Sequence, residues 1–127
     1  MLNKKNQVAS IPVNIPVINN LFEKFPSNLE EESFEVFLNN EHFRLKRIVS
    51  EGHTTPEGTW LCEDSDEWVI LLKGSAKLMF QDDRVIKEMN PGDYCIIPAG
   101  LKHRVEWTDP AKKTVWLALH YDTGKKD

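Results

Sequence analysis

The sequence contains only two cysteines, Cys62 and Cys95, in 127 residues. Two cysteines do not make a disulfide framework, and we expect both to be reduced thiols. The sequence also lacks any apolar run near the roughly 18 residues of a membrane helix. Close to the N-terminus the apolar residues are interrupted by asparagine, Pro12 and Pro16, which disfavours a signal peptide. These absences predict a cytoplasmic protein that does not cross a membrane.

Positive charge is scarce and scattered along the chain. The 16 Lys and Arg residues stand against 20 Asp and Glu residues, which gives a formal net charge of −4. A nucleic-acid surface needs a basic stripe, and this sequence has none. It also has no nucleophile triad and no zinc pair, and Gly58 is not followed by the Lys-Ser/Thr of a phosphate-binding loop. We therefore expect no nucleic-acid partner.

Strand signals dominate from residue 43 onward. Short apolar or alternating segments recur at roughly 8–12-residue spacing and are separated by Gly, Pro, Asn or Asp, which predicts an all-β sandwich or barrel. No linker or repeat divides the chain, so we expect one domain over 21–123 and a polar tail at 124–127. The predicted strands are 43–50, 67–73, 76–80, 85–89, 94–97, 103–107 and 114–121, with a short one at 60–62.

The N-terminal part predicts two other elements. Residues 1–20 contain two prolines, which cannot donate to a β-ladder, so we expect an extended arm that lies across a sheet of its own chain or of a partner. One short helix is predicted over 27–38. Its signals are Ser27 as a cap with Glu30 three residues later, followed by apolar side chains three and four residues apart.

Two ionisable side chains fall on apolar strand faces. Alternate residues of a strand share a face, so His103 lies with Val105 and Trp107 and is expected to face the interior. Glu67 also alternates with apolar residues, and a buried carboxylate is costly unless it is paired or binds a metal ion. The alternative for both is a polar pair without a metal, in which Glu67 contacts a backbone donor or His103.

Further candidates lie on the acidic and glycine-containing segment before Glu67. His53 belongs to the loop 51–59, which could fold over the barrel mouth and supply an imidazole; the alternative is an exposed loop histidine. Glu63 belongs to an acidic turn, for which solvent exposure is the default. Cys62 is either an inert thiol or a metal ligand.

The last strand carries a histidine whose direction depends on register. If a hairpin at 108–113 sets Trp107 opposite Thr114, His120 points inward, and a slip of one residue turns it outward. The sequence leaves both registers open. The tryptophans that we expect to line a pocket are Trp60, Trp107 and Trp116.

The order and spacing of two motifs resemble the cupin family over about residues 52–121. Glu67 followed after six residues by Gly74 resembles the second half of the first cupin motif. The His-x-His that usually precedes that Glu is missing. The second motif is matched in full by Gly92, five residues, Pro98, one residue, Gly100, two residues and His103. With three intervening residues the missing pair falls on Leu61 and Glu63, and with four on Trp60 and Cys62.

The resemblance implies a double-stranded β-helix, the jelly-roll barrel of cupins. It also implies Glu67 and His103 as ligands of one divalent metal ion, iron, manganese, zinc or nickel. The set would be completed by His53, Cys62, Glu63 or His120. Open positions on the ion would polarise a substrate oxygen or activate O₂, as in an oxygenase, isomerase or lyase.

Whether the chain is an enzyme stays open at this point. The leading interpretation is a small-molecule-binding cupin of unknown substrate. The rival interpretations are a metal-free ligand-binding or sensor module and a structural dimer without a site. Trp68 shares an outer strand face with Ile70 and Leu72, which predicts burial against another subunit. Cupins commonly dimerise in this way, so the resemblance also implies a homodimer.

Overall fold

The computed structural model describes residues 14–26 and 29–122. Within these residues the backbone forms strands, turns and extended segments, and it contains no helix that could span a membrane. The strands are β1 (Ser33–Asn39), β2 (Phe43–Ser50), β3 (Asp66–Lys73), β4 (Ala76–Phe80), β5 (Ile86–Met89), β6 (Tyr94–Ile97), β7 (His103–Thr108) and β8 (Thr114–Tyr121). From β2 onward they agree closely with the predicted strands, because turn residues separate them.

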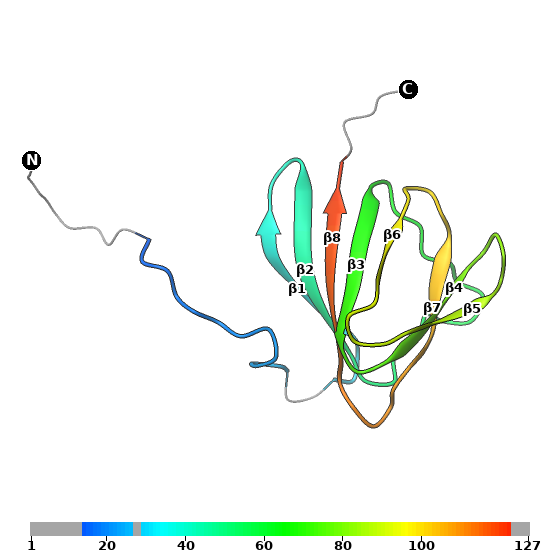
Figure 1. Ribbon diagram of the computed structural model, residues 1–127, viewed down its shortest axis with the longest axis horizontal. Helices are drawn as coiled ribbons and strands as arrows, with labels where there is room; N and C mark the ends of the chain where they lie inside the picture. Colours follow the sequence, from blue (N-terminus) through cyan, green and yellow to red (C-terminus); the bar gives the residue numbers. More distant parts are fainter. Residues whose placement is uncertain (1–13, 27–28, 123–127) are drawn as a thin grey trace, which may run out of the picture.

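The strands form two antiparallel sheets that enclose a barrel (Figure 1). The larger sheet has the order β1-β2-β8-β3-β6, and the smaller one has the order β5-β4-β7. Apolar residues from both sheets meet between them and make the core. The buried members of this core are Val69, Leu71, Ala76, Leu78, Met89, Ile97, Trp116 and Ala118. The all-β part of the predicted fold is confirmed.

Strand pairing fixes which side chains of the larger sheet face the barrel. On β8, Trp116, Ala118 and His120 are buried, whereas the residues between them are half-buried. Glu67 on β3 pairs with His120, so both side chains lie on the inner face. His120 therefore points inward, and its pairing with β3 sets this direction, not a pairing of Trp107 with Thr114.

The predicted helix is wrong. β1 occupies this part of the chain and pairs antiparallel with β2, with a register shift between Val36 and Leu38. Apolar residues at 34, 36 and 38 alternate as well as showing the helical spacing of 34, 37 and 38, and the ladder with β2 decides between the two patterns. Ser27, the predicted cap, lies outside the described residues.

The segment before β1 is attached to the outer face of the larger sheet by Arg47. The Arg47 guanidinium donates to the backbone oxygens of Leu21 and Glu23, both at 2.9 Å, and pairs with Glu35 at 2.6 Å. Residues 14–20 form no strand and lead away from the barrel (Figure 1). The rest of the predicted arm, 1–13, and the predicted tail at 124–127 lie outside the described residues.

The predicted hairpin at 108–113 is also wrong. β7 and β8 belong to different sheets, so the segment between them crosses from one sheet to the other. Along β7, Val105 pairs with Leu78 and Trp107 pairs with Lys77, so Glu106 is an extra residue between two successive pairs. This bulge interrupts the alternation of side chains along β7.

Candidate functional site

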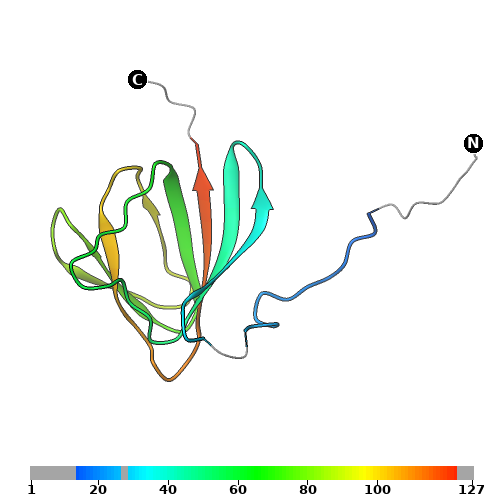
Figure 2. The ribbon, with the colours of Figure 1, turned by 180° about the vertical axis from the view of Figure 1, so that it is seen from behind.

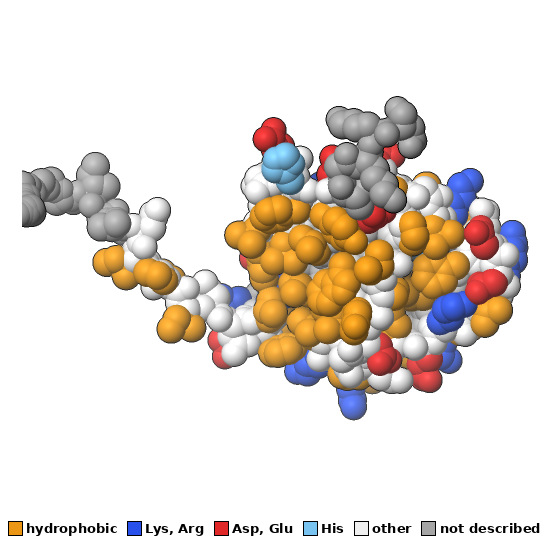
Figure 3. Space-filling model, turned by 45° about the horizontal axis from the view of Figure 1, so that its top comes forward, with side chains coloured by type: hydrophobic (Ala, Val, Ile, Leu, Met, Phe, Trp, Pro, Cys, Tyr) orange, Lys and Arg blue, Asp and Glu red, His pale blue; other side chains and the backbone are white. Residues whose placement is uncertain are grey.

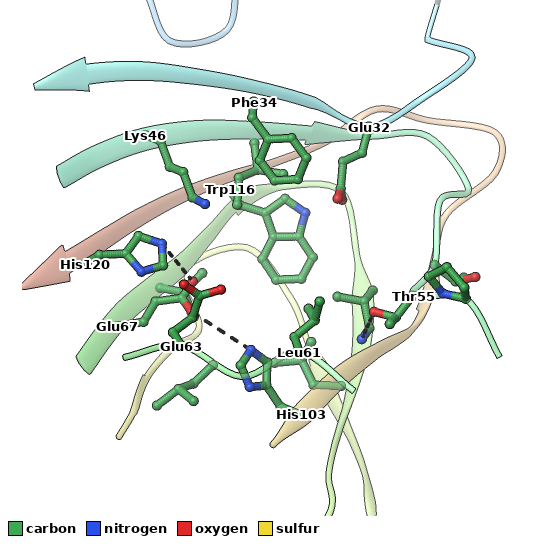
Figure 4. A pocket seen from close by; sticks show the side chains of 17 residues that line it. Glu32, Phe34, Lys46, Thr55, Leu61, Glu63, Glu67, His103, Trp116 and His120 are labelled. Carbon is green, nitrogen blue, oxygen red and sulfur yellow. Dashed lines mark hydrogen bonds and ion pairs between the residues drawn. The ribbon is translucent and has the colours of Figure 1, made fainter. Parts of the chain in front are cut away.

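A cavity of about 330 Å³ lies inside the barrel (Figure 4). One part of its wall is apolar, and the other carries carboxylates, imidazoles and one lysine. The apolar lining comes from Phe34, Ile48, Pro56, Leu61, Val69, Leu78, Ile97, Val105 and Trp116. The polar lining comes from Glu32, Lys46, Thr54, Thr55, Glu63, Glu67, His103 and His120.

Three buried side chains from three different strands meet at the polar part of the cavity. The carboxylate of Glu67 lies between the two imidazoles (Figure 4). One of its oxygens is 4.0 Å from His103 Nε2, and the other is 3.9 Å from His120 Nε2. These separations are too long for direct hydrogen bonds. The polar pair predicted as the alternative, Glu67 with His103, is therefore present only as a looser contact.

The orientation of His103 is set by a backbone contact. Its Nδ1 lies 2.9 Å from the carbonyl oxygen of Leu101, which can only accept a hydrogen bond, so Nδ1 carries the proton. In the neutral ring, Nε2 then has a free lone pair, and this atom is the one that faces Glu67. The turn before β7 therefore presents His103 in the tautomer that a metal ion or a ligand donor can use.

His120 is buried without a hydrogen bond. Neither of its ring nitrogens has a hydrogen-bond partner among the described residues. Burial lowers the pKa of His120, and the positive charge of Lys46 lowers it further, whereas Glu63 raises it. The ring is therefore held neutral, with one nitrogen lone pair available. A buried polar group without a partner is costly, so this histidine indicates a bound group that would satisfy it.

The ionised form of Glu67 is disfavoured by its burial. Burial raises its pKa above the ordinary value of 4.5, and nearby Glu63 adds to this effect. His103 and Lys46 act in the opposite direction. A positive charge placed beside Glu67 would lower its pKa and relieve the cost of its burial.

The structure also decides between the two registers of the missing His-x-His. Leu61 pairs with His103 through two backbone hydrogen bonds of 2.7 and 3.0 Å, and this isolated bridge turns Leu61 and Glu63 toward the cavity. Trp60 and Cys62 alternate with them and do not line the cavity. An aliphatic residue and a carboxylate thus stand where the family resemblance implied two imidazoles.

Several predicted site residues lie elsewhere. His53 accepts a hydrogen bond at Nδ1 from the Glu51 N–H, at 2.9 Å, and its Nε2 lies 3.2 Å from the Glu30 carbonyl oxygen. Cys62 is exposed. Neither residue lines the cavity.

Of the three tryptophans predicted to line the pocket, the structure places Trp116 in the cavity wall and the other two outside it. The guanidinium groups of Arg84 and Arg104 lie 5.6 and 5.9 Å from the centre of the Trp60 ring. Trp107 lies under Lys77 because the β7 bulge turns it away from the interior. The pocket assignments of Trp60 and Trp107 are therefore corrected.

The loop 51–59 forms part of the cavity wall. Thr55 donates its N–H to the Val105 carbonyl oxygen at 3.0 Å and accepts the Val105 N–H at its hydroxyl at 2.9 Å. Arg104 donates to the carbonyl oxygens of Thr55, Pro56 and Thr59. Figure 2 shows the connection between β2 and β3 running along the barrel beside β7. This loop therefore encloses the cavity and does not supply the imidazole of His53.

The prediction missed Lys46, which lines the cavity from β2. The period of two was visible in the sequence, and it separated Lys46 and Ile48 from Leu45 and Val49. No local pattern indicates that the side with the lysine is the one that faces inward. Figure 4 shows the Lys46 side chain extending from β2 toward the polar part of the cavity.

Two curved antiparallel sheets around a small cavity, with an acid and two imidazoles on its wall, define a jelly-roll barrel with an internal polar site. The chain belongs to the cupin family, because a model of the cupin domain matches residues 50–120. This confirms the resemblance seen in the motifs. No curated protein matches the chain in sequence.

Solved structures agree with this assignment. A protein from Ralstonia eutropha JMP134, named a "putative mannose-6-phosphate isomerase", is 39% identical with a TM-score of 0.81, over 85% of this chain and 100% of that one. A RmlC-like cupin family protein from Methanocaldococcus jannaschii is 19% identical with a TM-score of 0.61, over 78% and 87%. The polyketide cyclase RemF from Streptomyces resistomycificus is 19% identical with a TM-score of 0.61, over 77% and 75%. The last two similarities concern the fold alone.

Proposed function

We propose that the chain binds a small molecule in the barrel cavity beside a divalent metal ion held by Glu67, His103 and His120. Glu63, which lines the same cavity, would be an additional oxygen donor. The observation that carries this proposal is His120. Both of its ring nitrogens are buried without a hydrogen bond, and Nε2 lies 3.9 Å from the Glu67 carboxylate, whose pKa is raised by burial.

The donor set fits a transition metal in kind. Two neutral imidazole nitrogens and a carboxylate suit iron, manganese, zinc and nickel. The donor atoms are too far apart to hold an ion as they stand. In the described part of the chain, no group of three or more His, Cys, Asp or Glu side chains is close enough to do so. Ligands about 2.1 Å from one ion lie roughly 3–3.5 Å apart, so the gaps of 4.0 and 3.9 Å have to narrow by less than about 1 Å.

The chain's own residues determine what such a site can do. A bound divalent ion would act as a Lewis acid toward a ligand oxygen. His103 is oriented by the Leu101 carbonyl, and the apolar wall around Trp116 borders the same space. Because Leu61 cannot coordinate an ion, fewer protein donors surround it, and this leaves room for the ligand.

The alternative function is a metal-free binding module. Its support is the apolar wall together with Leu61 at a position where the family resemblance implied a ligand. The name of the Ralstonia protein makes an isomerase one candidate for the reaction, without deciding between the two functions.

Titration calorimetry with Zn²⁺ and Mn²⁺ tests the proposal. We expect the wild-type chain to bind one ion, and Glu67→Gln and His103→Ala to lose binding while they stay folded. His42→Gln is the matched control, because His42 is an exposed histidine outside the cavity. Equal binding of the ion by the wild type and by both site variants would show that the ion binds at another site.

We further propose that a second copy of the chain covers the outer face of the larger sheet. Hydrophobic side chains gather on this face (Figure 3). They include Tyr94 and Ile96, which are 63% and 57% exposed. The residues that share the outer face with them are Leu45, Trp68, Ile70, Leu117 and Leu119.

The N-terminal arm supports a second copy as the occupant. Ile15, Val17 and Ile18 are 76%, 78% and 96% exposed, so the chain does not cover its own arm. The segment that follows the arm is bonded to Arg47 on the outer face. Arm residues 14–20 therefore begin beside the face and can pack against a partner placed on it, where both apolar surfaces become buried.

A further inference from the structure

The cavity contains a cation that the proposed metal site leaves unused. Lys46 extends into the cavity from β2, and its charge acts on both Glu67 and His120 by lowering their pKa values. No carboxylate in the described part of the chain lies within 4.0 Å of its ammonium. Its nitrogen lies 5.1 Å from the ring centre of Phe34, which holds the side chain over the cavity wall.

The position of the Lys46 ammonium is electrostatically favourable only while the carboxylates of Glu63 and Glu67 are negatively charged. Glu63 and Glu67 attract the ammonium in the protein without a metal ion. A divalent ion on these carboxylates would neutralise them and leave Lys46 facing another cation. The ammonium would then need a negative group close to it. Glu32, the third carboxylate on the wall, accepts a hydrogen bond from the Ser50 hydroxyl and is not among the carboxylates within 4.0 Å of a cation, so an anionic ligand can supply that group.

We propose that Lys46 binds the acidic group of a small, predominantly apolar carboxylic acid. This inference rests on the proposed function, because the carboxylate would lie between Lys46 and the metal-binding side chains. The body of the acid would contact Trp116 and the aliphatic wall. A lysine at the polar part of a small cavity whose other part is apolar suits a ligand with one charged end.

The lining argues against a sugar phosphate as the ligand. The hydroxyls of a sugar point outward all round its ring, whereas nine of the side chains on the wall are apolar and offer them no hydrogen bond. The polar side chains are gathered on one part of the wall, where they can bind one end of a ligand. Buried hydroxyls without partners are costly, so a multiply hydroxylated ligand is disfavoured relative to an apolar acid.

The test is titration calorimetry of the full chain loaded with Zn²⁺, with benzoate and 3-methylbutanoate as probes. Benzyl alcohol is the uncharged comparison, and mannose 6-phosphate is the phosphate comparison. We expect both carboxylates to bind, benzyl alcohol to bind at least about 10-fold more weakly, and Lys46→Met to weaken carboxylate binding about 10- to 100-fold. Lys46→Met should keep the wild-type zinc stoichiometry.

Lys77→Met is the matched control. Lys77 also lies over an aromatic ring, at 5.2 Å from the centre of Trp107, but outside the cavity. The substitution removes the same charge and the same kind of ring contact, and carboxylate affinity should stay within about 2-fold of the wild-type value.

The outcomes separate this inference from the proposed function. Zinc binding with carboxylate affinity unchanged in Lys46→Met would overturn the role of Lys46 and leave the metal site intact. Lys46-dependent carboxylate binding by a protein that takes up no zinc would overturn the metal site and retain the role of Lys46. Failure of both carboxylates to bind the zinc-loaded chain, or tighter binding of mannose 6-phosphate, would overturn the ligand class.

Discussion

Replacing Glu67 with Gln should have opposite effects on stability without and with metal. Glu67 is 8% exposed, and the imidazole nitrogens that face its carboxylate lie 3.9 and 4.0 Å away, too far for direct hydrogen bonds. An ionised group buried in this way costs stability, and Gln has the same shape without the charge. In metal-free protein at neutral pH, we expect Glu67→Gln to raise the free energy of unfolding by about 1 kcal/mol.

A bound metal ion should make the wild type more stable than Glu67→Gln. A ligand that binds the folded state at 100 times its dissociation constant adds about 2.7 kcal/mol to the free energy of unfolding. The wild type should gain this amount, and Glu67→Gln should gain little, so the wild type becomes the more stable protein. Urea denaturation with a chelator and with Zn²⁺ measures both differences. Glu57→Gln, an exposed carboxylate on the loop, is the control.

The pH dependence of the free energy of unfolding tests the same reasoning in a second way. Because the pKa of Glu67 is raised in the folded protein, its stability contribution is greatest below 4.5 and is lost as the pH rises through the folded pKa. The lowered pKa of His120 acts oppositely, so stability is lost as the pH falls below 6.5. Glu67→Gln should remove only the first dependence. A variant that is less stable than the wild type in chelator, or equally stabilised by zinc, would refute this reasoning.

Two predictions concern the rest of the structure. Gly74→Ala should destabilise the fold by about 3 kcal/mol in urea denaturation, because a Cβ would lie 2.7 Å from Thr114 Cα and 2.9 Å from the Lys113 oxygen at a φ of +91°. Gly100→Ala should lose only about 1 kcal/mol, since its φ is +84° with nothing within 4 Å; equal losses would contradict the role of the close contact. Deletion of residues 1–20, or Ile96→Lys on the outer face, should weaken self-association at least about 10-fold in sedimentation. Ile86→Lys, on the smaller sheet, should leave it unchanged, and an unchanged association constant in the first two variants would exclude this interface.

The strands could be predicted from the sequence because their ends are marked by local chemistry. Asn90, Pro91 and Gly92 end β5, and Pro98 with Gly100 ends β6. Such turns depend on a few neighbouring residues. The helix prediction was wrong because local information was not sufficient there. The apolar residues of this segment satisfy both a helical and a strand period, and only the pairing with β2 decides between them.

The candidate site was predictable only in part. Glu67 and His103 stood at motif positions on alternating strands, and the structure places them on one cavity. The direction of His120 depended on its pairing with β3, which no local pattern contains. Trp107 was misplaced because a bulge reverses the alternation along β7, and Lys46 was missed because a lysine on a strand ordinarily faces solvent.

The metal content of the purified protein tests the central claim most directly. The protein should be prepared without a chelator or a metal-binding affinity tag and analysed for iron, manganese, zinc and nickel. We expect close to one equivalent of one of these metals per chain in the wild type, and loss of the metal in Glu67→Gln and His103→Ala. Less than about a tenth of an equivalent in the wild type, or full retention in both variants, would contradict the proposed metal site.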